Sequence, residues 1–205
     1  RPTRALRARA ETTSAPFFPV FLRPGGQVSR LPSFMRIHPF QGLVPTPALA
    51  PEVACVPYDV VNAAEAAALA SGKPRSLLHV DRAEIDLPAG TDPYSEAVYA
   101  KALENFLALQ RGGVLVRESE PCLYVYQQQM GSHVQRGLIA GCHVDDYDQG
   151  LIKKHEKTRK DKEDDRTKLI DTLSADTGPV FLTYRDQAAV TALVNAKTAE
   201  PALHD

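Results

Sequence analysis

The sequence has few cysteines and no pattern that would pair them. Cys55, Cys122 and Cys142 are odd in number and widely spaced within 205 residues, and no Cys-x-x-Cys pair occurs. A disulfide scaffold would use more cysteines in a shorter chain. We therefore interpret all three as buried small apolar residues of a protein from a reducing compartment, and we expect a cytoplasmic location.

Long apolar runs and an excess of one charge are lacking too. A helix that spans a bilayer needs about 20 apolar residues, whereas the stretch from Phe17 to Leu22 is short and contains Pro19. The formal net charge is −1, so no global field draws the chain to nucleic acid or acidic membranes. Any phosphate binding must come from a local cluster of cations.

Several common functional motifs are absent. The sequence contains no GxxxxGK[ST], GxSxG or HExxH, and no GxGxxG followed by an acid. The usual nucleotide-binding, hydrolase and zinc-protease motifs therefore give no support here. Residues 1–34 show no helix or strand periodicity, and a coherent sequence opens at Met35. We expect residues 1–34 to be a disordered leader or a mis-assigned start.

The remaining sequence predicts a mixed α/β (α+β) fold, with a small mixed sheet, a β-hairpin and three to four flanking helices. Asn62 and Glu65 form a capping-box pattern before an alanine-rich helix. Asp92 is expected to cap the next helix, with Pro93 at its first position. Strands are expected at 53–56, 76–80, 114–116 and 180–184, a hairpin at 122–130 with 134–144, and further helices at 162–173 and 188–196.

A charged segment from Lys153 to Lys168 is the main candidate for a site, because His, Glu, Thr, Arg, Lys and Asp crowd together there. Arginine and lysine donate hydrogen bonds to phosphate or carboxylate, and a histidine can carry a proton near neutral pH. The candidate catalytic residues are His155, Glu156 and Asp59. The candidate phosphate- or substrate-binding residues are Lys157, Thr158, Arg159, Arg166 and Tyr58. Asp161 and Asp164 are weaker candidates for metal ligands.

The alternative is a solvated helix face, since alternating charges stabilise exposed helices. Asp164 lies four residues before Lys168, a spacing that allows an ion pair. Other histidines are weaker candidates. His79 lies in an apolar stretch, and His133 and His143 lie in or beside the hairpin, so we interpret them as core or rim residues.

Several segments resemble a prokaryotic family known as domain of unknown function 1015. They are Met35-Arg-Ile-His-Pro-Phe, Val56-Pro-Tyr-Asp-Val-Val, Glu84-Ile-Asp-Leu-Pro, Leu151-Ile-Lys-Lys-His-Glu-Lys-Thr, Lys162-Glu-Asp-Asp-Arg and Thr177-Gly-Pro-Val-Phe-Leu. The resemblance implies a cytosolic protein without an agreed activity. Members carry a downstream Asp-Gly-His-His-Arg motif, which resembles one in ParB and sulfiredoxin-like proteins, some of them nucleotide-dependent serine kinases or nucleotide hydrolases. The present sequence contains no such motif. We therefore expect residues 35–205 to be the N-terminal part of a single α/β domain, truncated at its C-terminus.

The resemblance and the charged segment together favour a phosphotransferase or phosphohydrolase acting on a small phosphorylated or amino-acid metabolite, with Mg²⁺ and a nucleotide as the implied cofactors. The alternatives are a non-catalytic module that binds a nucleotide or nucleic-acid phosphate, and an inactive fragment. The near-zero net charge disfavours nucleic acid.

Overall fold

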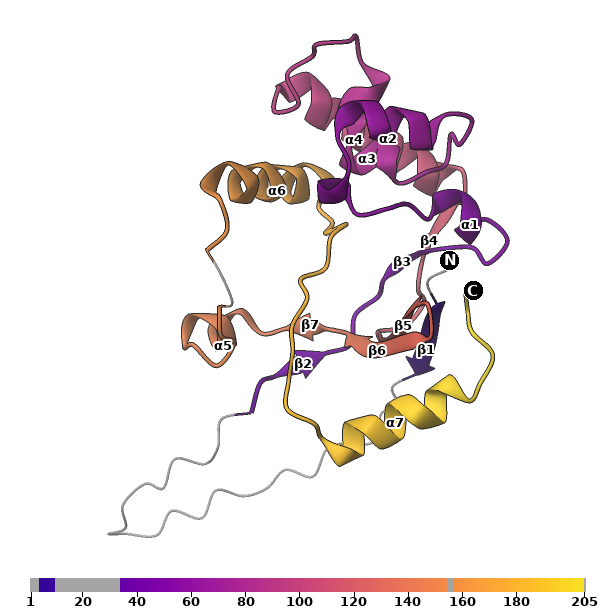
Figure 1. Ribbon diagram of the computed structural model, residues 1–205, viewed down its shortest axis with the longest axis vertical. Helices are drawn as coiled ribbons and strands as arrows, with labels where there is room; N and C mark the ends of the chain where they lie inside the picture. Colours follow the sequence, from indigo (N-terminus) through magenta and orange to yellow (C-terminus); the bar gives the residue numbers. More distant parts are fainter. Residues whose placement is uncertain (1–3, 10–33, 155–156, 205) are drawn as a thin grey trace.

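The computed structural model describes residues 4–9, 34–154 and 157–204, and it contains both helices and strands (Figure 1). The mixed α/β class is therefore confirmed. Among these residues, no helix combines the length and the apolar character that a membrane crossing needs.

The described strands form three small antiparallel sheets instead of one mixed sheet. The largest has the order β1-β5-β6, and its bounds are β1 Arg4–Arg9, β5 Cys122–Met130 and β6 His133–Ile139. The two smaller sheets pair β2 (Ile37–His38) with β7 (Gly141–Cys142), and β3 (Leu43–Pro45) with β4 (Leu115–Arg117). The predicted hairpin is confirmed as β5–β6, because Met130 pairs with His133 across a turn in which Gly131 adopts a φ of +62°.

Strand β1 was not predicted, and it lies within the segment expected to be a disordered leader. Arg4–Arg9 pairs antiparallel along the edge of β5. The backbone pairing with the edge of β5 accounts for this strand. Residues 10–33 lie outside the described residues.

Most of the helices gather at one end of the structure, and the last helix lies against the largest sheet (Figure 1). The α-helices are α1 Ala50–Val53, α2 Ala63–Ala70, α3 Leu78–Asp81, α4 Glu96–Arg111, α5 Val144–Asp148, α6 Lys160–Leu173 and α7 Ala188–Thr198. Two 3₁₀ turns accompany them, η1 Tyr58–Val60 and η2 Ala83–Asp86. Helix α7 contacts all three strands of the β1-β5-β6 sheet.

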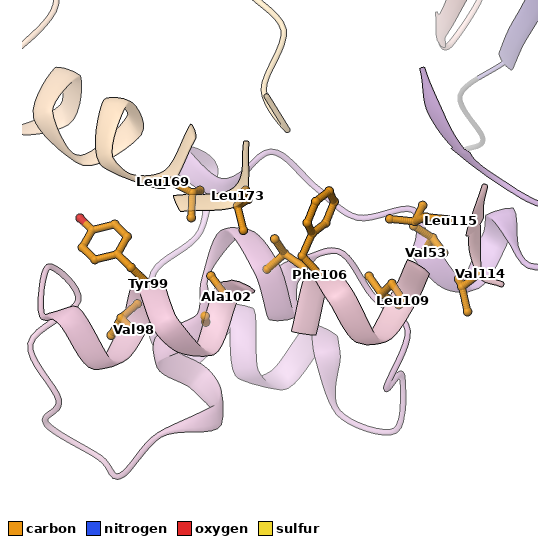
Figure 2. Close-up of a cluster of buried hydrophobic side chains, with 12 residues drawn as sticks. Val53, Val98, Tyr99, Ala102, Phe106, Leu109, Val114, Leu115, Leu169 and Leu173 are labelled. Atoms are coloured by element: carbon orange, nitrogen blue, oxygen red, sulfur yellow. The ribbon is translucent and has the colours of Figure 1, made fainter. Parts of the chain in front are cut away.

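The main hydrophobic core is built around α4, which contributes five of its buried residues, and it includes Leu169 and Leu173 of α6. Figure 2 shows Val98 and Ala102 of α4 below Leu169 and Leu173 of α6, with the ring of Phe106 beside Leu173. These side chains are buried, and those of α4 recur at near-helical spacing along one face of the helix. A smaller cluster joins Val125 of β5 to Val194 of α7.

The capping box at α2 is confirmed. The backbone N–H of Glu65 donates to Asn62 Oδ1 at 3.0 Å, and the backbone N–H of Asn62 donates to Glu65 Oε2 at 2.9 Å. Asp92, however, does not cap α4. Its Oδ1 accepts from the backbone N–H of Tyr94, which forms a local turn, and the helix begins one turn later, after Ser95.

Three predicted strands are wrong. Residues 76–80 instead lead into α3, because a short apolar run does not distinguish a strand from a buried helical turn. The strand expected at 53–56 does not form. Residues 50–53 instead belong to α1, which has a proline in its first turn. Residues 180–184 form neither helix nor strand, and Val180 is 80% exposed. The interpretation of the cysteines also needs correction, since Cys122 is buried but Cys55 and Cys142 are exposed.

We predict that α6 stabilises the protein through its buried edge alone. Leu173 is 5% exposed and the nearby Ile170 is 39% exposed. Leu173→Ala should lower the free energy of unfolding by about 2–5 kcal/mol, because it leaves a cavity in the core. Ile170→Ala is the matched control, and it should lower the free energy of unfolding by less than half as much. Equal losses in urea denaturation would contradict this packing.

A second prediction concerns Asp146, whose side chain is 1% exposed and accepts from the backbone N–H, Nε and Nη2 of Arg36. The Arg36 hydrogen bonds hold the pKa of Asp146 below its ordinary value. A depressed folded-state pKa contributes stability that is present above about pH 4 and is lost as the pH falls through the folded pKa. Urea denaturation should show this acid loss in the wild type and a smaller one in Asp146→Asn. An unchanged acid profile in the variant would contradict the account.

Candidate functional site

A polar pocket of about 140 Å³ lies between the α3–η2 segment, α4 and α6. Its walls combine three cations, three acids and three tyrosines. These residues are Arg82, Lys162 and Arg166; Asp81, Glu84 and Asp165; and Tyr58, Tyr94 and Tyr99. Such a concentration of ionisable groups in one concavity is typical of a binding or catalytic site.

Asp165 joins α6 to α4 at the base of this pocket. It is 8% exposed, and its Oδ1 accepts from the hydroxyl of Tyr99 at 2.8 Å. Its Oδ2 accepts from Nε and Nη2 of Arg166 at 3.0 and 2.7 Å. Burial and the hydrogen bond to Asp165 raise the pKa of Tyr99 well above its ordinary value, so Tyr99 stays protonated and remains a donor.

Arg166 is held on two sides. Its guanidinium carbon lies 4.0 Å from the centre of the Tyr58 ring, within the range of a cation–π contact. Its Nε and Nη2 donate to Asp165, and its Nη1 donates to none of the described residues. The guanidinium is therefore fixed in orientation and keeps hydrogen-bond donors for an anion.

Asp81 is an ionisable carboxyl group in the pocket wall. Thr177 donates its hydroxyl hydrogen to Asp81 Oδ1 at 2.5 Å. Burial raises the pKa of Asp81, although Thr177 and Arg166 partly oppose the shift. Burial and the nearby Asp81 also raise the pKa of the Cys55 thiol to about 11 although the residue as a whole is exposed, so this thiol is a poor nucleophile near neutral pH.

The other charged groups of the pocket have local partners. Arg82 Nε lies 2.9 Å from Glu84 Oε1, an ion pair whose angles fall outside those of a hydrogen bond. Lys162 Nζ donates to the hydroxyl of Tyr94 at 3.2 Å. Each cation thus has a nearby polar partner, and Lys162 is the one whose partner carries no formal charge.

The structure brings some of the predicted site residues together and leaves others apart. Tyr58 and Arg166 meet in the pocket, whereas Asp59 is exposed and is not among its lining residues. Lys157 and Thr158 are exposed. His155 and Glu156 lie outside the described residues.

The remaining candidates form ion pairs on the outer face of α6. Arg159 pairs with Asp161 at 2.7 Å, and Lys160 pairs with Asp164 at 2.7 Å. Asp164 therefore pairs with a residue other than the predicted Lys168, which instead contacts Glu96. Within the described part of the chain, no group of three or more His, Cys, Asp or Glu side chains could hold a metal ion. This face of α6 matches the alternative of a solvated surface.

Sequence reasoning missed Asp81 and Tyr99 as pocket residues. Neither gave a local signal, because Asp81 followed a predicted strand and Tyr99 lay within the helix expected after Asp92. Glu84 and Thr177 did carry a signal, since both open segments on which the family resemblance rests. The pocket lining takes residues from three such segments, which are far apart in the sequence. Thr177, from a fourth segment, donates to Asp81 in the pocket wall.

We predict that the Tyr99 hydroxyl stabilises the pocket by satisfying Asp165. Tyr99→Phe should lower the free energy of unfolding by about 1–3 kcal/mol, because Asp165 would lose one of its donors while remaining buried. Tyr184→Phe is the matched control, as Tyr184 is 55% exposed and should change stability by less than about 0.5 kcal/mol. Equal urea midpoints for the Tyr99→Phe variant and wild type would contradict the hydrogen bond.

Comparison with known proteins gives a family but no function. A family model described as "Protein of unknown function (DUF1015)" matches residues 37–205. No curated protein and no solved structure matches the chain. The likeness to ParB and sulfiredoxin-like proteins is not shown by these comparisons. The family match covers most of the chain and includes every segment of the pocket, so the chain belongs to the family of proteins of unknown function named DUF1015.

Proposed function

We propose that the pocket between α3–η2, α4 and α6 binds a small phosphorylated metabolite, and that the protein is a phosphotransferase or phosphohydrolase. The observation that carries this proposal is the guanidinium of Arg166, fixed by Asp165 and Tyr58 beside the protonatable carboxyl of Asp81. The three free cysteines support the accompanying proposal of a reducing, cytoplasmic location.

The anion-binding part of the proposal rests on preorganisation. Catalysis of phosphoryl transfer consists largely of positioning and of stabilising the charge on the transferred group. Arg166 is held before any ligand arrives, so little side-chain entropy is lost when an anion binds. Lys162 lines the same pocket, and its partner Tyr94 is neutral, which leaves its positive charge for a phosphate dianion.

The size of the pocket favours a small group. A volume of about 140 Å³ is below the roughly 300–1,000 Å³ of pockets that enclose drug-sized ligands. The phosphate end of a small metabolite fits this volume better than a whole nucleotide does. The part of a nucleotide that enters here would be its terminal phosphate.

Asp81 is the proposed proton-transfer group. In the transfer, the bond from phosphorus to the leaving oxygen breaks, and a bond forms from phosphorus to the oxygen of an acceptor hydroxyl or a water molecule. The carboxylate of Asp81 would take the proton of that attacking oxygen, and its protonated form would return one to the leaving oxygen. A carboxyl whose pKa lies nearer neutrality serves this role better than one with an ordinary pKa.

The proposal predicts different effects for two arginines of one short segment. Arg166→Gln should weaken the binding of phosphomonoesters about 10- to 100-fold, because it removes a charge-assisted donor. Arg159→Gln is the matched control, since Arg159 is 76% exposed and pairs with Asp161, and it should leave binding unchanged. Asp81→Asn should retain binding and lower turnover about 10²- to 10⁴-fold.

The measurement is ³¹P NMR of the wild type and the three variants with a panel of phosphomonoesters, alone and with ATP or ADP and Mg²⁺. Binding without turnover would favour the non-catalytic module. Neither binding nor turnover across the panel, or equal effects of the two arginine variants, would overturn the proposal.

A further inference from the structure

The connection between α6 and α7 exposes a run of large apolar side chains. Every residue from Gly178 to Ala189 is exposed, and Figure 1 shows this part of the chain as the long irregular stretch that leads into α7. Val180 is 80% exposed, Phe181 72% and Tyr184 55%. Single exposed apolar residues are ordinary, whereas a contiguous group of them is typical of a surface that meets another protein. The proposed function uses none of these residues.

The backbone of the same stretch is unpaired. Among the described residues, no backbone N–H or carbonyl group from 179 to 186 takes part in a backbone–backbone hydrogen bond. Residues 180–184 read Val-Phe-Leu-Thr-Tyr, and β-branched and aromatic residues such as these favour strands. An exposed backbone of this kind is a template on which another extended segment can pair. We call residues 180–184 the docking segment.

The docking segment is held on both sides. Before it, Thr177 donates its hydroxyl hydrogen to Asp81 in the wall of the candidate site. After it, helix α7 packs on the largest sheet, where Val194 is buried against Val125 of β5. Because both ends are anchored, the docking segment loses less conformational entropy on pairing than a free peptide would.

An antiparallel copy of the docking segment complements it in one register. When Leu182 lies opposite Leu182 of the second copy, Val180 lies opposite Tyr184. These side chains share one face, because successive side chains alternate along a strand. Phe181 lies opposite Thr183 on the other face. Pairs of an aromatic with a β-branched residue stabilise antiparallel strands, and this register forms such a pair at four positions.

The flanking residues disfavour the neighbouring registers. A shift of one or two residues in one direction brings Pro179 opposite a residue of the docking segment, and proline has no N–H to donate to a ladder. A shift in the other direction brings Arg185 opposite Val180 or Phe181, so that a charge faces an apolar side chain. In the register centred on Leu182, Pro179 and Arg185 lie opposite each other, just beyond the paired residues.

We propose that the docking segment binds a second copy of this chain, which pairs with it antiparallel about a two-fold axis at Leu182. A two-fold interface uses the same surface on both copies, and a self-complementary register meets this requirement. Five residues from each copy bury less surface than a standard interface of about 1,600 Å². The dimer should therefore be weak, with a Kd on the order of 10–100 µM.

Sedimentation velocity of the whole chain between about 5 and about 500 µM spans this Kd. Leu182→Lys should abolish the dimer, because it places two like charges directly opposite each other. Leu193→Lys is the matched control, since Leu193 is 73% exposed on α7 and lies outside the docking segment, and it should dimerise as the wild type does. A wild type that stays monomeric throughout would overturn the proposal and leave the docking segment to a different partner. Equal dimerisation of both variants would overturn it too.

Two charge-swapped variants test the register and the identity of the occupant. One carries Val180→Lys and Tyr184→Lys, and the other carries Val180→Glu and Tyr184→Glu. Each should be monomeric alone, because like charges lie opposite each other in its dimer. An equimolar mixture should form a heterodimer, because every lysine then faces a glutamate. Circular dichroism checks that both variants are folded, and a mixture of folded variants that stays monomeric would contradict the register.

Discussion

The candidate site depends on the buried carboxylate of Asp165. It accepts from Tyr99 on α4 and from Arg166 on its own helix, so one side chain fixes the contact between two helices and the direction of the guanidinium. A buried carboxylate must be satisfied or it destabilises the fold. The donors that satisfy it here also line a pocket, which is why the packing of α4 against α6 and the arrangement of the site cannot be separated.

The short α3–η2 segment links two pockets. Asp81, Arg82 and Glu84 line the first, which is the candidate site, and His79 and Asp86 line a second of about 340 Å³ beside the C-terminal end of α2. Its turns are too short to be stable alone, and they are held by Leu78, Val80 and Ala83 in the core and by Asn105 at the surface. A ligand in the first pocket thus contacts the same segment that forms a wall of the second.

Much of the fold could be predicted from local signals. The capping box at Asn62, the hairpin around Gly131 and the extent of α6 each follow from neighbouring residues. The wrong strands were short apolar runs, whose structure is decided by what they pack against and not by their own pattern. Strand β1 likewise depends on the edge of β5.

The same distinction between local patterns and packing against distant segments explains which site residues could be predicted. The charged segment indicated the right helix, but most of its charges pair with each other on the outer face, and the pocket takes only Lys162, Asp165 and Arg166 from it. Their partners Tyr99 and Asp81 come from distant segments, and no local pattern marks them.

The central claim is that Arg166 keeps a donor free for an anion while Asp165 and Tyr58 hold it. The most direct measurement is side-chain ¹⁵N NMR of the arginine guanidinium groups during titration with inorganic phosphate. The account predicts that the signals of Arg166 shift and exchange more slowly with water, while those of the exposed Arg159 do not change. Signals of Arg166 that stay unchanged, or that move no more than those of Arg159, would contradict it.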